Sequence, residues 1–352
     1  MSAPTAAPAP ATRFALPPGG EAHEPPERRG LTRDGVRLLV ARPGVVRHLR
    51  FHDLPDMLDP GDIVVVNTSA TLPAALDARR RDGSRLPLHV STGLDDGRWV
   101  VEPRRVDGHG PDTTLGPGEV LDLPGGRTLT LRDPYPDPAA GPGRLWTADV
   151  APATPPARYL ARHGRPIGYA HLTGATALSD HQTVYATEAG SAEMPSAGRP
   201  FTDRLLVRLM AAGVVVAPVV LHAGVSSPEL HEPPIPERFR VPPATARLVG
   251  ATRDAGGRVV AVGTTAVRAI ESAADPSGRV TATGGWTGLV LGPDRPARVV
   301  DGLVTGLHEP EASHLLLLEA VAGTALVGEA YAAAVAGGYL WHEFGDSMLL
   351  LP

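Results

Sequence analysis

The sequence contains no cysteine and no lysine. Without cysteine the chain has no disulfides, no thiolate catalysis and no cysteine-ligated zinc or iron–sulfur cluster. Without lysine it has no Schiff-base residue and no amine nucleophile. Every cationic contact to a ligand must therefore come from arginine, histidine or the end of a helix.

Long apolar runs and an excess of positive charge are also missing. No apolar run reaches about 18 residues, so we expect no membrane span. The first 30 residues show no basic segment followed by an apolar one, so we expect no signal peptide. The formal net charge of −5 gives no global attraction for nucleic acid, although the 33 arginines can still form a local basic stripe. These features predict a cytoplasmic protein.

The composition changes along the 352 residues in a way that indicates an insertion. Residues 77–150 form short segments of alternating apolar and polar residues between Gly, Pro and Asp turns, which is typical of a small antiparallel β-barrel. Residues 31–76 and 151–352 mix buried strands with helices, which predicts one discontinuous α/β (α+β) domain. Residues 1–30 are rich in Ala and Pro and predict a disordered or extended N-terminal arm.

One strand–turn–helix unit is the strongest candidate site. Val259–Val262 reads as a buried strand, followed by Gly263, Thr264 and Thr265 at the start of a helix that carries Arg268. Glycine allows close backbone approach, and the hydroxyls, free N–H groups and dipole of the helix end favour a polar or anionic ligand. The alternative is an ordinary turn in which Thr264 or Thr265 is the N-cap.

Polar residues follow or adjoin four other apolar strands. They are Asn67, His222, Thr305 and Asp346, and we expect them at strand ends, where α/β proteins place their sites. Each has a structural alternative: Asn67 can cap its own backbone, and a lone histidine such as His222 is more often a satisfied structural residue.

A second helix start lies near Thr202. Thr202 is a good N-cap, and Leu205, Leu206 and Leu209 follow with helical spacing. The preceding Pro195–Gly198 segment then lies at the mouth of the helix, where a carboxylate, a phosphate or a sugar hydroxyl can bind.

In this order the motifs resemble one family, the S-adenosylmethionine:tRNA ribosyltransferase-isomerases of queuosine biosynthesis. The resemblance covers roughly residues 33–352. It rests on these segments: Arg37–Val40, Phe51–Leu58, Pro60–Asp62, Asn67 with Pro73 and Ala74, Gln182–Ala186, Pro195–Gly198 with Phe201 and Thr202, Leu221–Gly224, Gly263–Thr265 with Arg268 and Glu271, Thr305 with His308 and Pro310, and Gly345–Leu349.

The resemblance implies an α/β domain with an inserted barrel and a defined reaction. The ribosyl group of S-adenosylmethionine is transferred to the aminomethyl group of a 7-deazaguanine base in tRNA and isomerised to epoxyqueuosine, with release of adenine and methionine. S-adenosylmethionine is a co-substrate, and no metal or redox cofactor is implied.

The matching motifs also suggest roles for individual residues. The titratable candidates for proton transfer are His222, His308, Asp346 and Glu271, because a base must remove the acidic C5′ proton beside the sulfonium. Thr264, Thr265 and Arg268 would hold the methionine carboxylate or the ribose hydroxyls. The remaining expected substrate contacts are Asn67, Pro195, Ser196, Ala197, Gly198, Thr202, Gly263 and Thr305.

Several positions depart from the family pattern. The family's Asp-Thr-Arg after Asn67 is Thr68-Ser69-Ala70 here, and a second family arginine is Ala75. The family histidine in the Pro195 motif is Pro200, and the segment Glu232–Val241 has no clear counterpart of the family's His-x-Met-His-x-Glu. Lost arginines weaken the case for tRNA, since phosphate contacts supply much of the affinity. A small nucleoside-like acceptor, or ligand binding without catalysis, therefore remains as an alternative.

Overall fold

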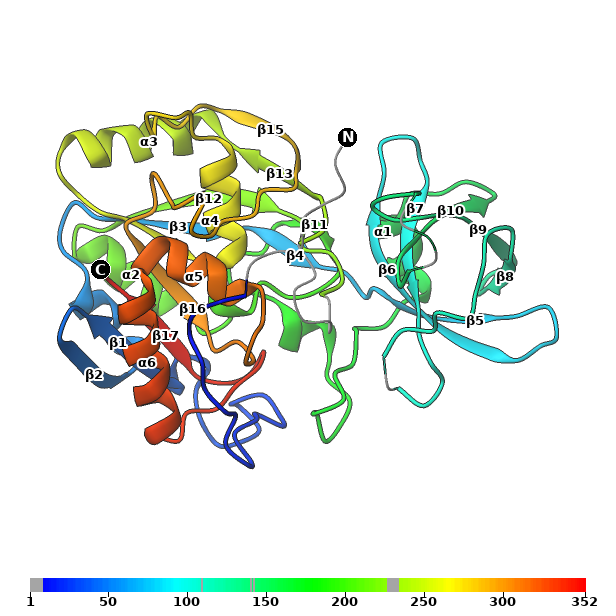
Figure 1. Ribbon diagram of the computed structural model, residues 1–352, viewed down its shortest axis with the longest axis horizontal. Coiled ribbons are helices and arrows are strands. Elements are labelled where there is room, and N and C mark those ends of the chain that lie inside the picture. Colours follow the sequence, from blue (N-terminus) through cyan, green and yellow to red (C-terminus); the bar gives the residue numbers. More distant parts are fainter. Residues whose placement is uncertain (1–8, 109, 140, 142, 227–233) are drawn as a thin grey trace.

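The computed structural model describes residues 9–108, 110–139, 141, 143–226 and 234–352. It combines a nine-stranded mixed sheet, covered by helices, with a closed six-stranded barrel. Figure 1 shows the barrel at one end of the long axis, beside the sheet domain. The predicted α/β domain with an inserted antiparallel barrel is therefore confirmed.

The sheet has the strand order β15-β13-β12-β3-β14-β16-β17-β1-β2. Its four central strands, β12, β3, β14 and β16, are parallel, so their carboxyl ends meet at one edge. Asp346 adjoins a strand as predicted: it directly precedes β17, which runs antiparallel to β16 and begins beside the carboxyl end of β16. The strands are β1 (Arg37–Arg42), β2 (Val45–Arg50), β3 (Ile63–Asn67), β12 (Val215–Leu221), β13 (Glu237–Val241), β14 (Val259–Val262), β15 (Thr283–Thr287), β16 (Gly302–Gly306) and β17 (Ser347–Leu350).

Both faces of the central strands β3 and β14 are buried, which explains their continuous apolar runs. In β3, Ile63 and Val65 belong to the core on one face, and Val64 and Val66 to the core on the other. The first face is covered by α3 (Pro243–Asp254), α4 (Gly263–Ser272), α5 (His314–Ala322) and α6 (Thr324–Ala336). The second is covered by the 3₁₀ helix η2 (Phe51–Met57) and by α2 (Asp203–Ala211).

The barrel closes in the order β10-β7-β6-β5-β8-β9, and all of its strand pairs are antiparallel. Trp99 and Trp146 are fully buried in its core, as expected for structural rather than ligand-binding tryptophans. The helix α1 (Pro156–His163) packs against this core through Tyr159 and Leu160. The strands are β5 (Ala75–Arg79), β6 (Arg85–Gly93), β7 (Trp99–Pro103), β8 (Val120–Leu123), β9 (Arg127–Pro134) and β10 (Trp146–Ala151).

A two-stranded parallel ribbon lies where the chain leaves and re-enters the sheet domain. It pairs β4 (Ser69–Thr71) with β11 (Glu188–Ser191). Short 3₁₀ helices η1 (Arg33–Gly35), η3 (Leu178–His181) and η4 (Ser196–Gly198) complete the connections. The strand β4 follows β3, and β11 leads into residues 193–198. Their pairing therefore holds residues 193–198 near the carboxyl end of β3.

The N-terminal arm is ordered against the sheet domain from residue 9 onward. The backbone N–H and hydroxyl of Thr12 both donate to Glu319 of α5, and Glu21 pairs with Trp341 in an isolated bridge. Residues 1–8 of the predicted arm lie outside the described residues. The described part of the arm contains turns and contacts α5, the segment before β17 and, through Glu27 and Arg28, Arg199 and Asp180.

Two further findings bear on the sequence predictions. The described part of the proline-rich stretch 228–243 contains the strand β13, which pairs with β12 and β15 and for which the sequence gave no signal. Residues 228–233 of that stretch lie outside the described residues. Among the described residues no single helix has the length and apolar character of a membrane span. The helices α5 and α6 have that length and character only when taken together, and they are bent by 119° relative to each other.

Candidate active site

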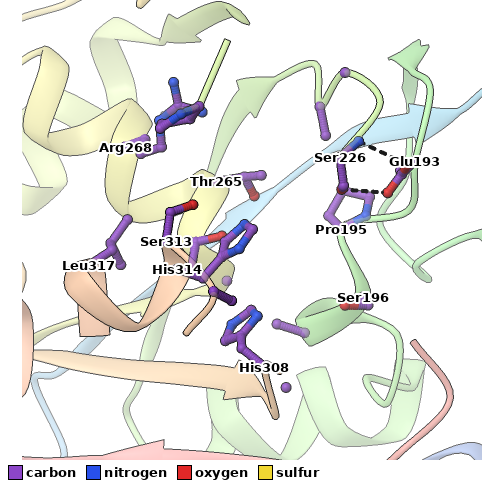
Figure 2. A pocket seen from close by; sticks show the side chains of 18 of the residues that line it. Glu193, Pro195, Ser196, Ser226, Thr265, Arg268, His308, Ser313, His314 and Leu317 are labelled. Atoms are coloured by element: carbon purple, nitrogen blue, oxygen red, sulfur yellow. Dashed lines mark hydrogen bonds between the residues drawn. The ribbon is translucent and has the colours of Figure 1, made fainter. Parts of the chain in front are cut away.

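A cavity of about 280 Å³ opens at the sheet edge where β12, β14 and β16 end. The starts of α4 and α5 form one side, and residues 193–197 and 223–226 form the opposite side (Figure 2). Nine of the residues predicted from the sequence line this cavity: Pro195, Ser196, Ala197, Gly263, Thr264, Thr265, Arg268, Thr305 and His308. The fold therefore brings three separate motifs to one place.

The helix α4 begins directly at Gly263, which has a φ of +83°. This left-handed conformation favours glycine and lets β14 pass into the helix without a connecting loop. The alternative in which Thr264 or Thr265 is the N-cap is wrong, because both lie inside the first turn, and no side chain of the described residues caps the helix. The first N–H groups thus keep their capacity to bind an anion or a hydroxyl at the cavity wall.

Asn67 supports this wall without lining the cavity. Its amide nitrogen donates to the backbone oxygen of Leu221 at 2.8 Å and to Thr265 Oγ1 at 3.1 Å. Its amide oxygen accepts from the backbone N–H groups of Ser69 and Leu221. Asn67 therefore satisfies the ends of two strands and positions Thr265, so its contribution to a bound ligand is indirect.

Arg268 lines the cavity, but its charge is already paired. The guanidinium forms an ion pair with Glu237 of β13 and donates to the backbone oxygens of Leu289 and Thr287. Burial raises the pKa of Glu237, and the adjacent guanidinium opposes that rise. Arg268 thus ties α4 to β13 and offers a ligand only the part of its guanidinium that these partners leave open.

Two stacked histidines lie beside α5. The rings of His308 and His314 are 4.7 Å apart and almost parallel, at 3°. His308 Nε2 lies 3.1 Å from Thr305 Oγ1. Burial lowers the pKa of His308 well below its ordinary value and that of His314 to about 4, so both imidazoles are neutral at neutral pH. They can exchange hydrogen bonds with an uncharged base or hydroxyl.

Glu193 faces the cavity from the other side and was not predicted. Its carboxylate accepts from the backbone N–H of Ser226 at 2.9 Å and from the Ser226 hydroxyl at 2.6 Å (Figure 2). Burial raises the pKa of Glu193 to about 7, against the lowering effect of the Ser226 hydrogen bonds. A carboxyl group with this pKa can accept or donate a proton near neutral pH.

Two of the predicted catalytic carboxylates do not reach the cavity. Glu271 is buried on α4, where its oxygens accept from the backbone N–H groups of Arg298, Val299 and Val300. Asp346 accepts from the backbone N–H groups of Arg37 and Leu340 at 2.7 and 2.9 Å. Both side chains satisfy main-chain donors, which is a structural role, and their catalytic roles stay predictions.

His222 also lies outside the cavity lining. Its Nδ1 is 2.7 Å from Ser69 Oγ, and its Nε2 is 3.8 Å from Glu188. Burial lowers the pKa of His222. A Cβ added to Gly190 would lie 2.3 Å from the ring, so glycine is required for this packing. His222 therefore holds the β4–β11 ribbon to the end of β12.

The remaining two predicted contacts are structural as well. Gly198 packs against Tyr185, whose hydroxyl would lie 2.1 Å from an added Cβ. Thr202 is the N-cap of α2, as predicted, and its hydroxyl accepts from the backbone N–H of Leu205 at 3.1 Å. The Pro195–Gly198 segment meets the cavity through its first three residues, while Thr202 stabilises the helix behind it.

Several lining residues gave no usable signal in the sequence. Glu193 lies two residues before Pro195, and His314 is the first residue of α5, a few residues after Pro310, so only proximity to a motif hinted at either. Tyr169, Arg144 and Glu343 come from segments with no recognisable pattern, and Arg144 precedes the barrel strand β10. Only the folded chain shows that the inserted barrel reaches the cavity.

Comparison with known proteins agrees with the resemblance seen in the motifs. The model of the family described as "Queuosine biosynthesis protein" matches residues 11–350. The S-adenosylmethionine:tRNA ribosyltransferase-isomerase of Moorella thermoacetica is 35% identical over 96% of this chain and 98% of its own length. The Synechococcus elongatus enzyme of the same name is 36% identical over 96% and 94%.

A solved structure extends the comparison to the fold. The S-adenosylmethionine tRNA ribosyltransferase of Thermotoga maritima is 30% identical and covers 97% of this chain and 99% of its own, with a TM-score of 0.53. Sequence motifs, family model and fold thus agree over nearly the full length. The chain belongs to the queuosine biosynthesis family of S-adenosylmethionine:tRNA ribosyltransferase-isomerases.

Proposed function

We propose that this protein transfers and isomerises the ribosyl group of S-adenosylmethionine onto the aminomethyl group of a 7-deazaguanine base in tRNA. Epoxyqueuosine forms, and adenine and methionine leave. The observation that carries the proposal is the cavity itself, in which the motifs around Pro195, Gly263 and His308 meet. The family membership supports the same reaction. The cytoplasmic location expected from the sequence stays a prediction.

The α4 side of the cavity suits the anionic and hydroxyl groups of S-adenosylmethionine. The helix start at Gly263 and the side chains of Thr264 and Thr265 offer donors for the methionine carboxylate or the ribose hydroxyls. Because Arg268 is paired with Glu237, we assign the larger share of this binding to the helix end. The neutral His308 and His314 offer hydrogen bonds to the departing adenine.

The reaction requires proton acceptors for the C5′–H beside the sulfonium and for the attacking aminomethyl group. A base works best when its pKa lies near the working pH. The pKa of Glu193 is about 7, whereas burial makes the imidazole of His308 a much weaker base. We therefore assign the general base to Glu193 and keep His308 as a hydrogen-bonding partner of the substrate.

The test is incubation of the protein with S-adenosylmethionine and tRNA that carries 7-aminomethyl-7-deazaguanine, with chromatographic detection of adenine and methionine. Parallel reactions contain the free base in place of tRNA. Release that depends on the modified tRNA supports the proposal. Release with the free base alone points to the small-molecule acceptor, and binding of S-adenosylmethionine without release under either condition contradicts the proposed activity.

A pair of histidine variants separates lining from non-lining residues. His308→Gln alters the cavity wall, whereas His222→Gln alters the nearby ribbon. We expect turnover to fall in His308→Gln and to stay within a few-fold of wild type in His222→Gln. Loss of turnover in His222→Gln, with His308→Gln unaffected, would reverse the assignment of the cavity as the active site.

A further inference from the structure

Three side chains with metal-ligating atoms meet at the edge of the cavity. They are His171, between α1 and η3, and His342 and Glu343, which precede β17. One ligand atom from each lies within 4.8 Å of the others. The sequence gave no indication of a metal, because these residues are about 170 positions apart and follow no recognised spacing.

Two of these atoms face each other without a hydrogen bond. His171 Nε2 lies 3.2 Å from Glu343 Oε2, and within the described part of the chain both atoms are buried and have no hydrogen-bond partner. Buried polar atoms are rarely left in this state. A neutral imidazole lone pair and a carboxylate oxygen repel each other, so the pair requires a cation or a proton between the two atoms.

The third residue is held in place by the backbone and by its neighbours. The His342 ring stacks on the His171 ring at 4.2 Å, and its Nε2 lies 2.9 Å from Glu21 of the N-terminal arm. The φ of His342 is +74°, an uncommon conformation for a residue other than glycine. The fold retains this strained backbone conformation, which keeps the His342 ring beside the His171 ring.

The donor set selects a class of ion. Two imidazoles and one carboxylate are typical ligands of Zn²⁺, whereas Ca²⁺ and Mg²⁺ prefer oxygen ligands alone. Zinc bonds of about 2.0–2.2 Å place tetrahedral ligand atoms roughly 3.3 Å apart, close to the observed His171–Glu343 separation of 3.2 Å. His342 offers a ligand nitrogen within 4.8 Å of the other two ligand atoms, and its ring must turn out of the stack with His171 for both imidazoles to reach one ion.

We propose that His171, His342 and Glu343 bind one divalent transition-metal ion of the zinc type. Glu343 also lines the substrate cavity, so the ion lies in the cavity wall. It joins the segment after α1, the segment before β17 and, through Glu21, the N-terminal arm. The site goes beyond the proposed function, because ribosyl transfer needs no metal in the mechanism above.

The experiment uses the full-length protein after dialysis against a chelator. Zn²⁺ binding is measured by calorimetry, and Co²⁺ binding by its visible absorption, which reports nitrogen and oxygen ligation directly. We expect one equivalent of metal per chain in the wild-type protein. In His171→Gln and Glu343→Gln we expect affinity to fall by more than the 10- to 100-fold that loss of an outer-shell partner produces.

His52→Gln is the matched control, because His52 also lies near a carboxylate, Asp53 at 3.7 Å, but belongs to no three-residue cluster. It should bind metal as wild type does. No binding to wild type at millimolar Zn²⁺ would show that a proton occupies the His171–Glu343 contact, and equal binding by Glu343→Gln and wild type would also overturn the proposal. Glu343→Gln keeps the side-chain shape and decides the case if His171→Gln fails to fold.

Discussion

The two sides of the cavity differ in how their polar groups are satisfied. On the sheet side, Arg268 in the cavity wall and Asn67 and Glu271 behind it use nearly all of their hydrogen-bonding capacity within the protein. On the loop side, Glu193 is bound only to Ser226, and Glu343 Oε2 has no hydrogen bond within the described part of the chain. The polar groups of the sheet side are satisfied within the protein, whereas the loop side keeps polar atoms that can still bind a ligand.

This contrast predicts which substitutions change the stability of the fold and which change the activity. A group that is satisfied internally stabilises the fold and contributes to the reaction only by positioning others. A buried carboxyl with few partners costs free energy in the folded state and is typical of functional sites. Substitutions on the sheet side should therefore lower stability, whereas substitutions on the loop side should lower activity and spare or raise stability.

The largest expected effect is on the sheet side, in Arg268→Met. It leaves Glu237 buried without a cation, which costs about 3–5 kcal/mol of unfolding free energy. The double variant Arg268→Met with Glu237→Gln removes the unpaired charge and should recover most of that loss. Urea denaturation of the two single variants and the double variant measures the coupling. Equal stability of Arg268→Met and wild type would break the proposed contrast.

Glu193→Gln is the corresponding test on the loop side. Loss of the proposed general base should lower kcat/KM by roughly 10²- to 10⁴-fold. In the wild-type enzyme kcat/KM should rise with pH through about 7 as Glu193 ionises, and this dependence should vanish in the variant. A pH–rate profile of both proteins is the measurement. A variant that keeps full activity and the same profile would remove Glu193 from the mechanism.

The same variant should be more stable than wild type above neutral pH. Burial raises the pKa of Glu193 from 4.5 to about 7, so the folded state binds a proton that the unfolded chain has released. That proton's stabilising effect is lost as pH rises through about 7. Glu193→Gln should gain on the order of 1 kcal/mol at pH 8, below the bound of about 3 kcal/mol that the pKa shift sets. Denaturation at pH 5 and pH 8 compares the two proteins.

Glu271→Gln should cost about 2 kcal/mol, because an amide cannot accept all the backbone hydrogen bonds that the carboxylate takes. Activity of the folded fraction should stay near that of wild type. Thermal unfolding together with turnover at low temperature distinguishes the two effects. Lost turnover in a fully stable Glu271→Gln protein would return Glu271 to the catalytic candidates.

The smallest effect is expected in Thr202→Ala. Loss of the N-cap should lower stability by about 1 kcal/mol, with no change in KM for S-adenosylmethionine. Thr202→Ser keeps the hydroxyl and is the matched control. A raised KM in Thr202→Ala, restored in Thr202→Ser, would show that the hydroxyl contacts substrate after all.

Much of the fold could be predicted from local pattern. The apolar run Ile63–Val66, the capped helix after Thr202 and the alternating segments between 77 and 150 all carry periodic signals, and each forms the expected element. The strand β13 was missed because the stretch before it is rich in proline, which is unusual next to a strand inside a sheet. Its pairing with β15 joins residues more than 40 positions apart, and such pairing leaves no local trace.

The candidate site could be predicted only in part, for a similar reason. Gly263, Thr264 and Thr265 could be recognised because a strand end beside a helix start is a local feature. The direction of a side chain is not local. Glu271 and Arg268 stand on the same helix, yet one reaches the backbone of residues 298–300 and the other the cavity, and Glu193 became a candidate only when its environment was known.

The position of β3 in the sheet has a consequence for synthesis of the chain. β3 is central, but its neighbours β12 and β14 begin at Val215 and Val259, well over a hundred residues later. At about 5–20 residues per second, the ribosome needs several seconds or more to deliver them. The barrel, complete by Ala151, can fold in that interval. The inserted barrel can thus be folded while β3 is still unpaired and prone to aggregate. This state lasts until the ribosome has released β12 and β14.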